Sequence, residues 1–288
     1  MEEKNIYKLI FKETYGFDYD ELTKNRAEDI KKYIAILRNS YKRNVPNTPY
    51  EESEIRKAYM LCYYPNYIGP IYTLMNKYIN KKIKTLLKTT INVSFLGAGP
   101  GPEVYGCLKS LNEYLINKKI ICNLYDHEGE WDNQRRVTEI LLTTLRNLRI
   151  KVNNIYGCNF MESCSNVCNR WVTCKEREFQ SDIIVMQNCI NHMEDTKKFE
   201  ETLMEKFKVM KSGAYFIIID LQYDNVEEVI NYLKKSTGEY MNVLENGKDT
   251  YRLHIDMPEK MKEYIFVGGN NYIAKKNTNY NYIILERK

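Results

Sequence analysis

The sequence predicts an α/β fold, in which a helical N-terminal region precedes a mostly parallel sheet that ends in an antiparallel hairpin. Strand-like and helix-like segments alternate from Ile91 onward, which is the pattern of a doubly wound sheet. The first strand-like segment ends in a glycine-rich turn that leads directly into a helix-like segment. Strand-like runs at the extreme C-terminus predict the closing hairpin.

The first 90 residues are predicted to be helical and to form a region distinct from residues 91–288. Apolar residues recur at helical spacing, with charged residues between them, at Ile30, Tyr33, Ile34 and Leu37. The segment 44–49 contains two prolines and two asparagines, so it predicts a break. Further helices are predicted at Glu51–Tyr64, where Pro65 interrupts the helix, and at Ile68–Leu87.

Five strands and four helices are predicted in the α/β region. The strands are Asn92–Leu96, Lys119–Tyr125, Arg149–Tyr156, Asp182–Met186 and Ala214–Leu221. The helices are Glu103–Asn117, Asp132–Leu145, Glu194–Lys211 and Val226–Lys235. The last 17 residues, Tyr272–Lys288, contain two strand-like runs around Asn277–Asn281, which predicts a terminal hairpin.

Composition indicates a soluble protein of a reducing compartment. A chain of 288 residues can bury a full core, and eight cysteines at this length are too few for a disulfide scaffold. No apolar run approaches the roughly 18 residues that a membrane span needs, and the N-terminus lacks the pattern of a signal peptide. We therefore expect a cytoplasmic location and no membrane partner.

Positive charge is concentrated before the glycine-rich turn. No acidic residue occurs from Ile55 to Pro102, whereas basic residues stand at Arg56, Lys57, Lys77, Lys81, Lys82, Lys84 and Lys88. Tyrosines are interleaved with them at positions 59, 63, 64, 67, 72 and 78. Basic side chains with aromatic rings suit phosphates and stacked bases. The same pattern also fits a solvated helix surface with tyrosines in the core or in a lid.

The glycine-rich turn carries the clearest functional signal. Its residues are Gly97, Ala98, Gly99, Pro100 and Gly101, followed by Pro102 and Glu103. Glycines let the backbone come close to a ligand, and the helix start offers free N–H groups. The motif GAGPGPE resembles motif I of class I S-adenosylmethionine (SAM)-dependent methyltransferases. Dinucleotide-binding folds open similarly, but they continue with parallel strands rather than with a terminal hairpin.

The resemblance covers about residues 91–288 and implies a seven-stranded Rossmann-like methyltransferase sheet, closed by an antiparallel strand. It implies SAM as the cofactor and methyl transfer as the activity. The segment 91–288 would then be the catalytic domain, and residues 1–90 a helical cap that shapes the acceptor site. The cofactor-binding residues expected from it are Gly97, Ala98, Gly99, Pro100, Gly101, Asp126, His127, Asn159, Phe160, Gln187 and Asn188.

The resemblance also implies individual roles for these residues. Asp126 ends the second strand, where a carboxylate can accept two hydrogen bonds from ribose hydroxyls; Glu128 is the alternative. Asn159 or Cys158, with Phe160, would contact adenine. Gln187 and Asn188 follow the fourth strand, at the loop that contacts the methionine part of SAM in this family. That loop does not match the Asp/Asn/Ser-Pro-Pro-aromatic motif of methyltransferases that act on planar amides or bases.

Two further hypotheses concern a catalytic base and a metal. His192 lies after the fourth strand and could act as a general base, although a structural role is the alternative. Four cysteines could hold zinc or an iron–sulfur cluster, although their spacing lacks the tight pairs of common zinc sites: Cys158, Cys164, Cys168 and Cys174.

A second resemblance concerns the segment Ala58–Pro65, AYMLCYYP. It resembles the N-terminal signature of methyltransferase-like proteins of small-ribosomal-subunit assembly, which carry a cysteine-bound cluster. The main prediction is thus a SAM-dependent methyltransferase with an RNA or a small-molecule acceptor. The alternative is a non-catalytic SAM-binding factor in RNA or ribosome assembly.

Overall fold

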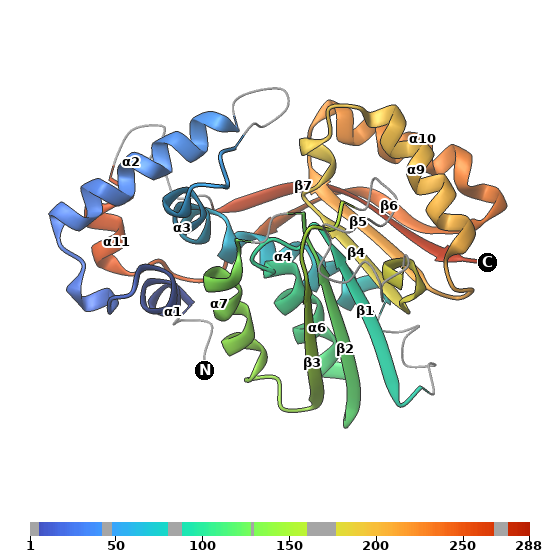
Figure 1. The fold of residues 1–288 in the computed structure, drawn as a ribbon, viewed down its shortest axis with the longest axis horizontal. Helices are drawn as coiled ribbons and strands as arrows, with labels where there is room; N and C mark the ends of the chain where they lie inside the picture. Colours follow the sequence, from blue (N-terminus) through green and yellow to red (C-terminus); the bar gives the residue numbers. More distant parts are fainter. Residues whose placement is uncertain (1–5, 42–47, 80–87, 128–129, 160–176, 268–275) are drawn as a thin grey trace.

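A seven-stranded sheet forms the centre of the computed structural model, which describes residues 6–41, 48–79, 88–127, 130–159, 177–267 and 276–288 (Figure 1). The strands are β1 (Thr90–Leu96), β2 (Lys118–Tyr125), β3 (Leu148–Ile155), β4 (Ile183–Gln187), β5 (Tyr215–Leu221), β6 (Met241–Arg252) and β7 (Asn277–Arg287). The first five lie within two residues of the predicted strands at each end, which confirms the predicted alternation.

The helices of the described residues surround this sheet. They are α1 (Ile6–Ile10), α2 (Lys24–Ser40), α3 (Ser53–Cys62), α4 (Tyr64–Leu74), α6 (Pro102–Tyr114), α7 (Asp132–Leu142), α9 (Thr196–Val209), α10 (Asp224–Ser236) and α11 (Glu259–Tyr264). Short π or 3₁₀ turns are η2 (Phe11–Tyr15), η3 (Tyr19–Glu21), η4 (Met75–Ile79), η5 (Arg177–Gln180), η6 (Ile190–His192) and η7 (Thr237–Glu239).

The strand order is β3-β2-β1-β4-β5-β7-β6. β1 to β5 pair in parallel, whereas β7 runs antiparallel to both of its neighbours. This is the sheet that the resemblance to class I methyltransferases implies, so the predicted fold is confirmed. The order of the strands reverses between β1 and β4, and in open α/β sheets ligands bind in the crevice at the carboxyl ends of the strands at such a point.

The position of the predicted C-terminal hairpin is wrong, although its antiparallel direction is right. Asn277–Asn281 is not a turn but the first part of β7. The antiparallel partner of β7 is β6, which pairs Arg252 with Asn277 and Met241 with Arg287. β6 was not predicted because it has no apolar run. It is an edge strand with charged residues along its length, and only its first residue, Met241, is fully buried.

Alternating residues of the sheet divide the core into two layers. In β5, Ile217 and Ile219 face the helices α4, α6 and α7, whereas Phe216 and Ile218 face α9 and α10. Side chains alternate between the two faces of a strand, and every residue of β4 and β5 is buried. A strand covered on both faces is continuously apolar, which explains why the central strands were predictable from sequence.

The N-terminal helices pack beside the sheet as a cap, together with a helix from the C-terminal part of the chain. Figure 1 shows α11 beside α1 and α2. The backbone N–H of Lys260 in α11 donates to the hydroxyl of Tyr19 over 2.7 Å, and the guanidinium of Arg38 lies 5.7 Å from the centre of the Phe266 ring. The cap, defined here as α1–α3 with α11, therefore draws on both ends of the chain.

The chain returns to the sheet through α4. Pro65 begins this helix rather than interrupting one, because the first turn of a helix tolerates the missing N–H of proline. The break falls at Tyr63, between α3 and α4. Within the described residues, none of the helices combines the length and the apolar character that crossing a lipid bilayer requires.

Candidate functional site

The glycine turn connects β1 to α6 and depends on backbone conformations that favour glycine. Gly97, Gly99 and Gly101 have φ angles of 63°, 48° and 82°. A Cβ atom on Gly97 would lie 2.5 Å from the Sγ atom of Cys189, which follows β4. The turn therefore passes directly over the end of β4, at the place where the strand order reverses.

Asp126 fastens this turn to the end of β2. Its Oδ2 atom accepts a hydrogen bond of 2.5 Å from the backbone N–H of Gly99. The N–H of Ala98 donates to the carbonyl of Tyr125 over 3.0 Å. Asp126 is buried, so its carboxylate is presented to the inside of the site rather than to solvent.

Two side chains of α7 hold the turn from the other side. The Nε atom of Arg135 donates to the carbonyl of Gly99 over 2.8 Å, and the hydroxyl of Thr138 donates to the carbonyl of Pro100 over 2.6 Å. Tyr64 of α4 shares a hydrogen bond of 2.6 Å with that hydroxyl. Because these carbonyls are bonded from behind, the turn has a fixed shape before any ligand arrives.

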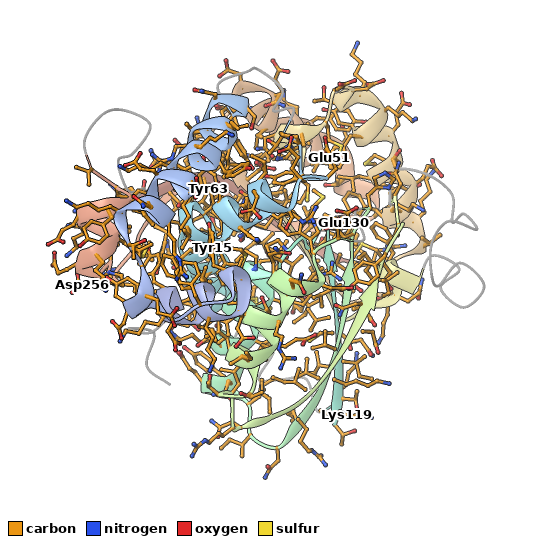
Figure 2. The ribbon with its side chains drawn as sticks, turned by 60° about the vertical axis from the view of Figure 1, so that its left-hand side comes forward. Tyr15, Glu51, Tyr63, Lys119, Glu130 and Asp256 are labelled. Atoms are coloured by element: carbon orange, nitrogen blue, oxygen red, sulfur yellow. The ribbon has the colours of Figure 1, made fainter. Side chains whose placement is uncertain are left out.

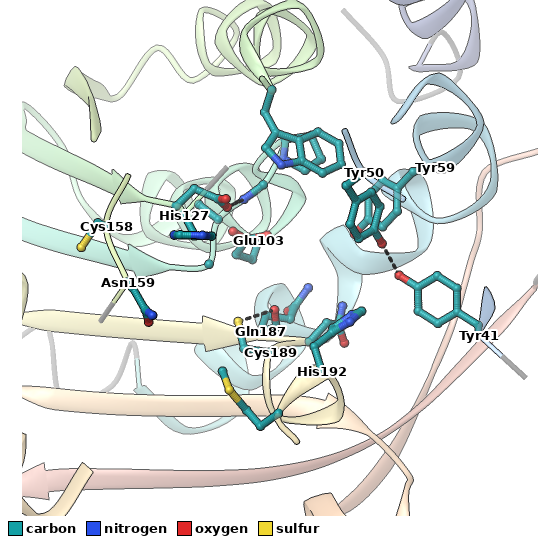
Figure 3. Close-up of a pocket in the computed structure, with 18 residues that line it drawn as sticks. Tyr41, Tyr50, Tyr59, Glu103, His127, Cys158, Asn159, Gln187, Cys189 and His192 are labelled. Atoms are coloured by element: carbon teal, nitrogen blue, oxygen red, sulfur yellow. Dashed lines mark hydrogen bonds between the residues drawn. The ribbon is translucent and has the colours of Figure 1, made fainter. Parts of the chain in front are cut away.

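A pocket of 360 Å³ opens over the turn (Figure 3). Its lining contains most of the predicted site residues: Gly97, Ala98, Gly99, Pro100, Asp126, His127, Asn159, Gln187, Asn188 and His192. These residues come from the carboxyl ends of β1, β2 and β4 and from the segment after β3. The volume falls in the range of roughly 300–1,000 Å³ that is usual for small-molecule sites.

The remaining predicted residues have different outcomes in the structure. Gly101 caps the N-terminus of α6 and does not line the pocket. Phe160, Cys164, Cys168 and Cys174 lie outside the described residues, and so does Glu128. Cys158 does line the pocket, beside Asn159. Among the described residues, no three histidine, cysteine or acidic side chains gather as a metal site.

Four aromatic side chains that sequence reasoning did not assign to the site form one wall of the pocket. They are Tyr41, Tyr50, Tyr59 and Trp131, here called the aromatic wall. The rings of Tyr50 and Tyr59 lie 5.3 and 5.7 Å from that of Trp131, and the hydroxyls of Tyr41 and Tyr50 are hydrogen-bonded to each other. The tyrosines come from the cap region, 70 to 90 residues before Trp131, so no local signal could predict their meeting.

His192 stands next to this wall. Its ring lies 5.8 Å from the Tyr41 ring, nearly perpendicular to it, and 6.4 Å from the Tyr50 ring. Figure 3 shows His192 between the end of β4 and the tyrosines, on the opposite side of the pocket from Cys158. The histidine is thus placed where the cap meets the sheet.

The segment after β4 is held in an uncommon conformation. Asn188 has a φ angle of 57°, a region that asparagine enters more readily than most residues, and its N–H donates to the carbonyl of Ile219 over 2.9 Å. The side-chain nitrogen of Gln187 donates to the carbonyl of Tyr67 in α4 over 2.7 Å. α4 therefore holds the last residue of β4, next to the segment that follows the strand.

Glu103 is a second acid of the pocket, and it was not among the cofactor-binding residues expected from the sequence. It lies in the first turn of α6 and is 4% exposed. Burial raises the pKa of Glu103 to about 8; its own backbone N–H opposes the rise, Asp126 adds to it, and Arg135 opposes it. The sequence shows that Glu103 belongs to the motif GAGPGPE, but it does not show that this side chain is buried.

Much of the acid-free stretch is engaged within the protein over its described part, although Lys77 is exposed and lies 4.9 Å from the centre of the half-buried Tyr78 ring. Tyr59, Tyr63, Tyr64 and Tyr67 are buried. Arg56 pairs with Glu130 over 2.7 Å, Lys57 with Glu54 over 2.5 Å and Lys88 with Asp182 over 2.5 Å. Figure 2 places Glu130 near the upper end of the sheet, far from Lys119 at the start of β2. These charges are used within the protein, and Lys81, Lys82 and Lys84 lie outside the described residues.

Two buried acids are expected to make the stability of the protein depend on pH. Burial raises the pKa of Asp220 to about 7, although backbone N–H groups, including those of Leu221 and Ile190, donate to it. Asp220 and Glu103 hold protons in the folded state that they lose on unfolding between about pH 4.5 and 8. The free energy of unfolding should therefore fall as pH rises, by up to about 1.4 kcal/mol per pH unit for each group.

Urea unfolding at pH 5, 6, 7 and 8 measures this effect. The variants Glu103→Gln and Asp220→Asn should each reduce the fall in stability with rising pH. Equal pH dependence in the parent and both variants would show that these acids do not hold their protons in the folded state.

Comparison with solved structures finds methyltransferases at low identity. An rRNA methylase from Streptococcus thermophilus is 9% identical over 72% of this chain and 93% of its own, with a TM-score of 0.37. The N-methyltransferase NodS from Bradyrhizobium japonicum WM9, solved with S-adenosyl-L-homocysteine (SAH), is 9% identical over 88% of this chain and 98% of its own, with a TM-score of 0.40. The pyocyanin biosynthetic protein PhzM is 12% identical over 100% of this chain and 74% of its own, with a TM-score of 0.41.

No family model and no curated protein matches this sequence. At such identities the substrates of the solved proteins belong to those proteins alone. The fold of this chain is identified by its own strand order and by its reversed strand β7.

Proposed function

We propose that this protein is a SAM-dependent methyltransferase whose acceptor is a small, planar molecule. The observation that carries the proposal is the buried carboxylate of Asp126, bonded to the glycine turn inside a pocket at the point where the strand order reverses. A nicotinamide-dependent enzyme is disfavoured, because the antiparallel β7 occupies the place where a further parallel strand would be expected.

The chemistry of the pocket fits SAM. A nucleoside needs an acceptor for the ribose hydroxyls, and the carboxylate of Asp126 supplies one at the end of β2. The amino-acid part of SAM needs close access to backbone atoms, which the glycine turn allows. The positive charge of SAM suits a pocket with two acids, Asp126 and Glu103. The Oε1 atom of Gln187 is buried and lacks a hydrogen-bond partner among the described residues, so it is a further acceptor for the ligand.

The residues divide the work between binding and orientation. Asp126 would hold the ribose, Cys158 and Asn159 would border the adenine, and Gln187 with Asn188 would border the methionine part. When bound, SAM supplies a methyl group on a positively charged sulfur. The protein then has to align the acceptor and exclude water, which the fixed turn and the aromatic wall accomplish. His192, which lines the pocket, would accept a proton from the acceptor.

The aromatic wall favours a small acceptor over RNA. Tyr50, Tyr59 and Trp131 offer ring faces inside a pocket, where a planar molecule would stack. The tyrosines of the acid-free stretch that would stack exposed bases are largely buried instead. RNA methylation and non-catalytic assembly therefore remain outcomes of the test rather than the leading proposal.

A thermal melt of the intact protein with SAM, SAH and NAD tests cofactor choice. A ligand that binds only the folded state, at about 100 times its dissociation constant, adds ~2.7 kcal/mol of stability. We expect a rise in melting temperature with SAM and SAH and none with NAD. A rise with NAD alone, or with none of the three, contradicts the proposal.

Transfer of a radiolabelled methyl group identifies the acceptor class. The protein is incubated with labelled SAM and either total RNA or a low-mass metabolite fraction. Label in the low-mass fraction supports the small acceptor, whereas label in RNA that ribonuclease releases assigns an RNA acceptor. SAM binding together with salt-sensitive RNA binding, but without transfer to either fraction, would indicate the assembly factor.

A further inference from the structure

The carboxyl group of Glu103 is buried in the pocket without a cation to pair with it. Its Oε1 atom has no hydrogen-bond partner among the described residues, and no basic side chain in the described part of the chain lies within ion-pair distance of it. Burial without a paired cation disfavours the charged form of a carboxyl group, in agreement with the raised pKa of Glu103. Glu103 lines the same pocket as Asp126, so a ligand that enters this pocket meets it (Figure 3).

The groups that face Glu103 come from every element around it. Asp126 at the end of β2 adds negative charge. The other neighbours are neutral: the hydroxyls of Tyr59 and Tyr64 and the thiols of Cys107 and Cys189. Burial raises the pKa values of these four groups, and a charge on Glu103 would raise them further. The basic neighbour is Arg135 of α7.

Two of the three guanidinium nitrogens of Arg135 are engaged by other groups, whereas its Nη2 atom is buried without a hydrogen-bond partner among the described residues. Its Nε atom donates to the carbonyl of Gly99 over 2.8 Å, and one terminal nitrogen donates to the side chain of Asn154 over 3.1 Å. Its guanidinium carbon lies 4.7 Å from the centre of the Tyr156 ring. Arg135 lowers the pKa of Glu103, but none of its nitrogens lies within ion-pair distance of the Glu103 carboxyl group.

We propose that Glu103 pairs with a cationic group of the bound ligand, and that this pairing couples ligand binding to the release of a proton. The inference rests on the proposed use of SAM, which carries an ammonium group and a sulfonium group. The proton leaves the Glu103 carboxyl for the buffer, and the carboxylate that remains pairs with the cation. No covalent bond of the ligand changes.

The direction of the pH dependence follows from this exchange. Below the pKa of Glu103, about 8, the free protein holds a proton that the complex has lost. Ligand affinity therefore rises with pH, by up to about tenfold per pH unit. The useful window is pH 5.5–7.5, because an α-amino group loses its own charge near pH ~8.

Calorimetric titration of SAM at pH 7 measures the released proton directly. The binding enthalpy is compared in phosphate and in Tris, which take up protons with different enthalpies. We expect release of nearly one proton by the parent protein and none by Glu103→Gln. Because glutamine resembles the protonated acid, the two affinities should converge near pH 5.5 and diverge about tenfold per unit above it.

His127 and His192 are the matched controls, because they are the two histidines among the residues that line the pocket. At a saturating concentration of SAM, the number of protons released per SAM bound should persist in the double variant His127→Gln, His192→Gln, even where its affinity for SAM is lower, since both histidines line the pocket. Loss of proton release there, with retention in Glu103→Gln, would overturn the assignment to Glu103.

Three ligands separate the two cationic groups. SAH carries only the ammonium group, and 5′-methylthioadenosine carries neither cation. Release with SAM and SAH assigns the ammonium group as the partner of Glu103, and release with SAM alone assigns the sulfonium group. SAM binding without proton release, or with equal release by Glu103→Gln, overturns the inference and leaves the proposed function intact. No binding of SAM by the parent protein overturns both.

Discussion

Replacing Asp126 with alanine is expected to remove the stabilisation of the protein by SAM. The buried carboxylate is the proposed acceptor for both ribose hydroxyls, and it already holds the N–H of Gly99 over 2.5 Å. Hydrogen bonds to a charged group contribute about 1.5–3 kcal/mol each, so losing two of them weakens binding by about 100-fold or more. Isothermal titration measures the dissociation constant, and a thermal melt with SAM gives the loss of stabilisation.

Two further variants separate recognition from general effects. Asp126→Asn keeps an acceptor for the N–H of Gly99 but loses the charge and one acceptor, so its affinity should lie between those of the parent and the alanine variant. Asp132→Asn removes an exposed charge in the first turn of α7, outside the pocket, and should bind SAM like the parent. If Asp126→Ala binds SAM with the parent's affinity while remaining folded, the ribose is held elsewhere.

The parts of the fold that could be predicted from sequence are those with a local physical signature. β4 and β5 are buried on both faces, so their apolar runs mark them without reference to the rest of the chain. The glycine turn is marked by three glycines with positive φ angles, which glycine adopts without the steric cost that a Cβ atom imposes. Asp126 could be located because its distance from the turn follows from one helix and one strand.

The parts that could not be predicted depend on contacts between distant segments. β6 has little local apolar signal and is defined by its pairing with β7. α11 belongs to the C-terminal part of the sequence yet packs with Tyr19 of the cap. The aromatic wall requires a contact between Tyr50 and Trp131, which are 81 residues apart in the sequence. A helical pattern of tyrosines can indicate a buried helix face, but it does not indicate which cavity that face borders.

Glu103 shows how burial turns a visible residue into a functional candidate. In sequence it is the acid that follows the glycine turn, at a position where helices often carry acids for their favourable interaction with the helix dipole. In the structure it is removed from solvent beside a second acid, and burial raises its pKa to about 8. The chemical property that matters is set by the packing of α3, α4 and α7 around α6, which no local pattern specifies.

Replacing Gly106 with alanine is expected to be among the most destabilising single changes in the chain. Gly106 lies in the middle of α6, where a Cβ atom would collide with the backbone carbonyl oxygen of Ile68 and lie 2.8 Å from the Cγ2 atom of Ile71. Alanine favours a helix by roughly 0.5–1 kcal/mol over glycine, but overpacking against backbone costs about 1–3 kcal/mol or more. Urea unfolding should therefore show a net loss of stability.

The loss should extend to the pocket, because the displaced helix is α4. Tyr64 of α4 bonds to Thr138, which holds the glycine turn, and the carbonyl of Tyr67 fixes Gln187. Gly106→Ala should accordingly weaken SAM binding as well as stability, although residue 106 does not line the pocket.

Two other glycines isolate the steric cause. Gly238 has open space around it and no positive φ angle, so Gly238→Ala should leave stability unchanged or slightly higher. Gly213 has equally open space but a φ angle of 75°, so Gly213→Ala should cost only the conformational strain of about 1–2 kcal/mol. Neither should alter SAM affinity. If Gly106→Ala is as stable as Gly238→Ala, then α4 does not press on α6 as the structure describes, and the coupling from α4 to the glycine turn fails with it.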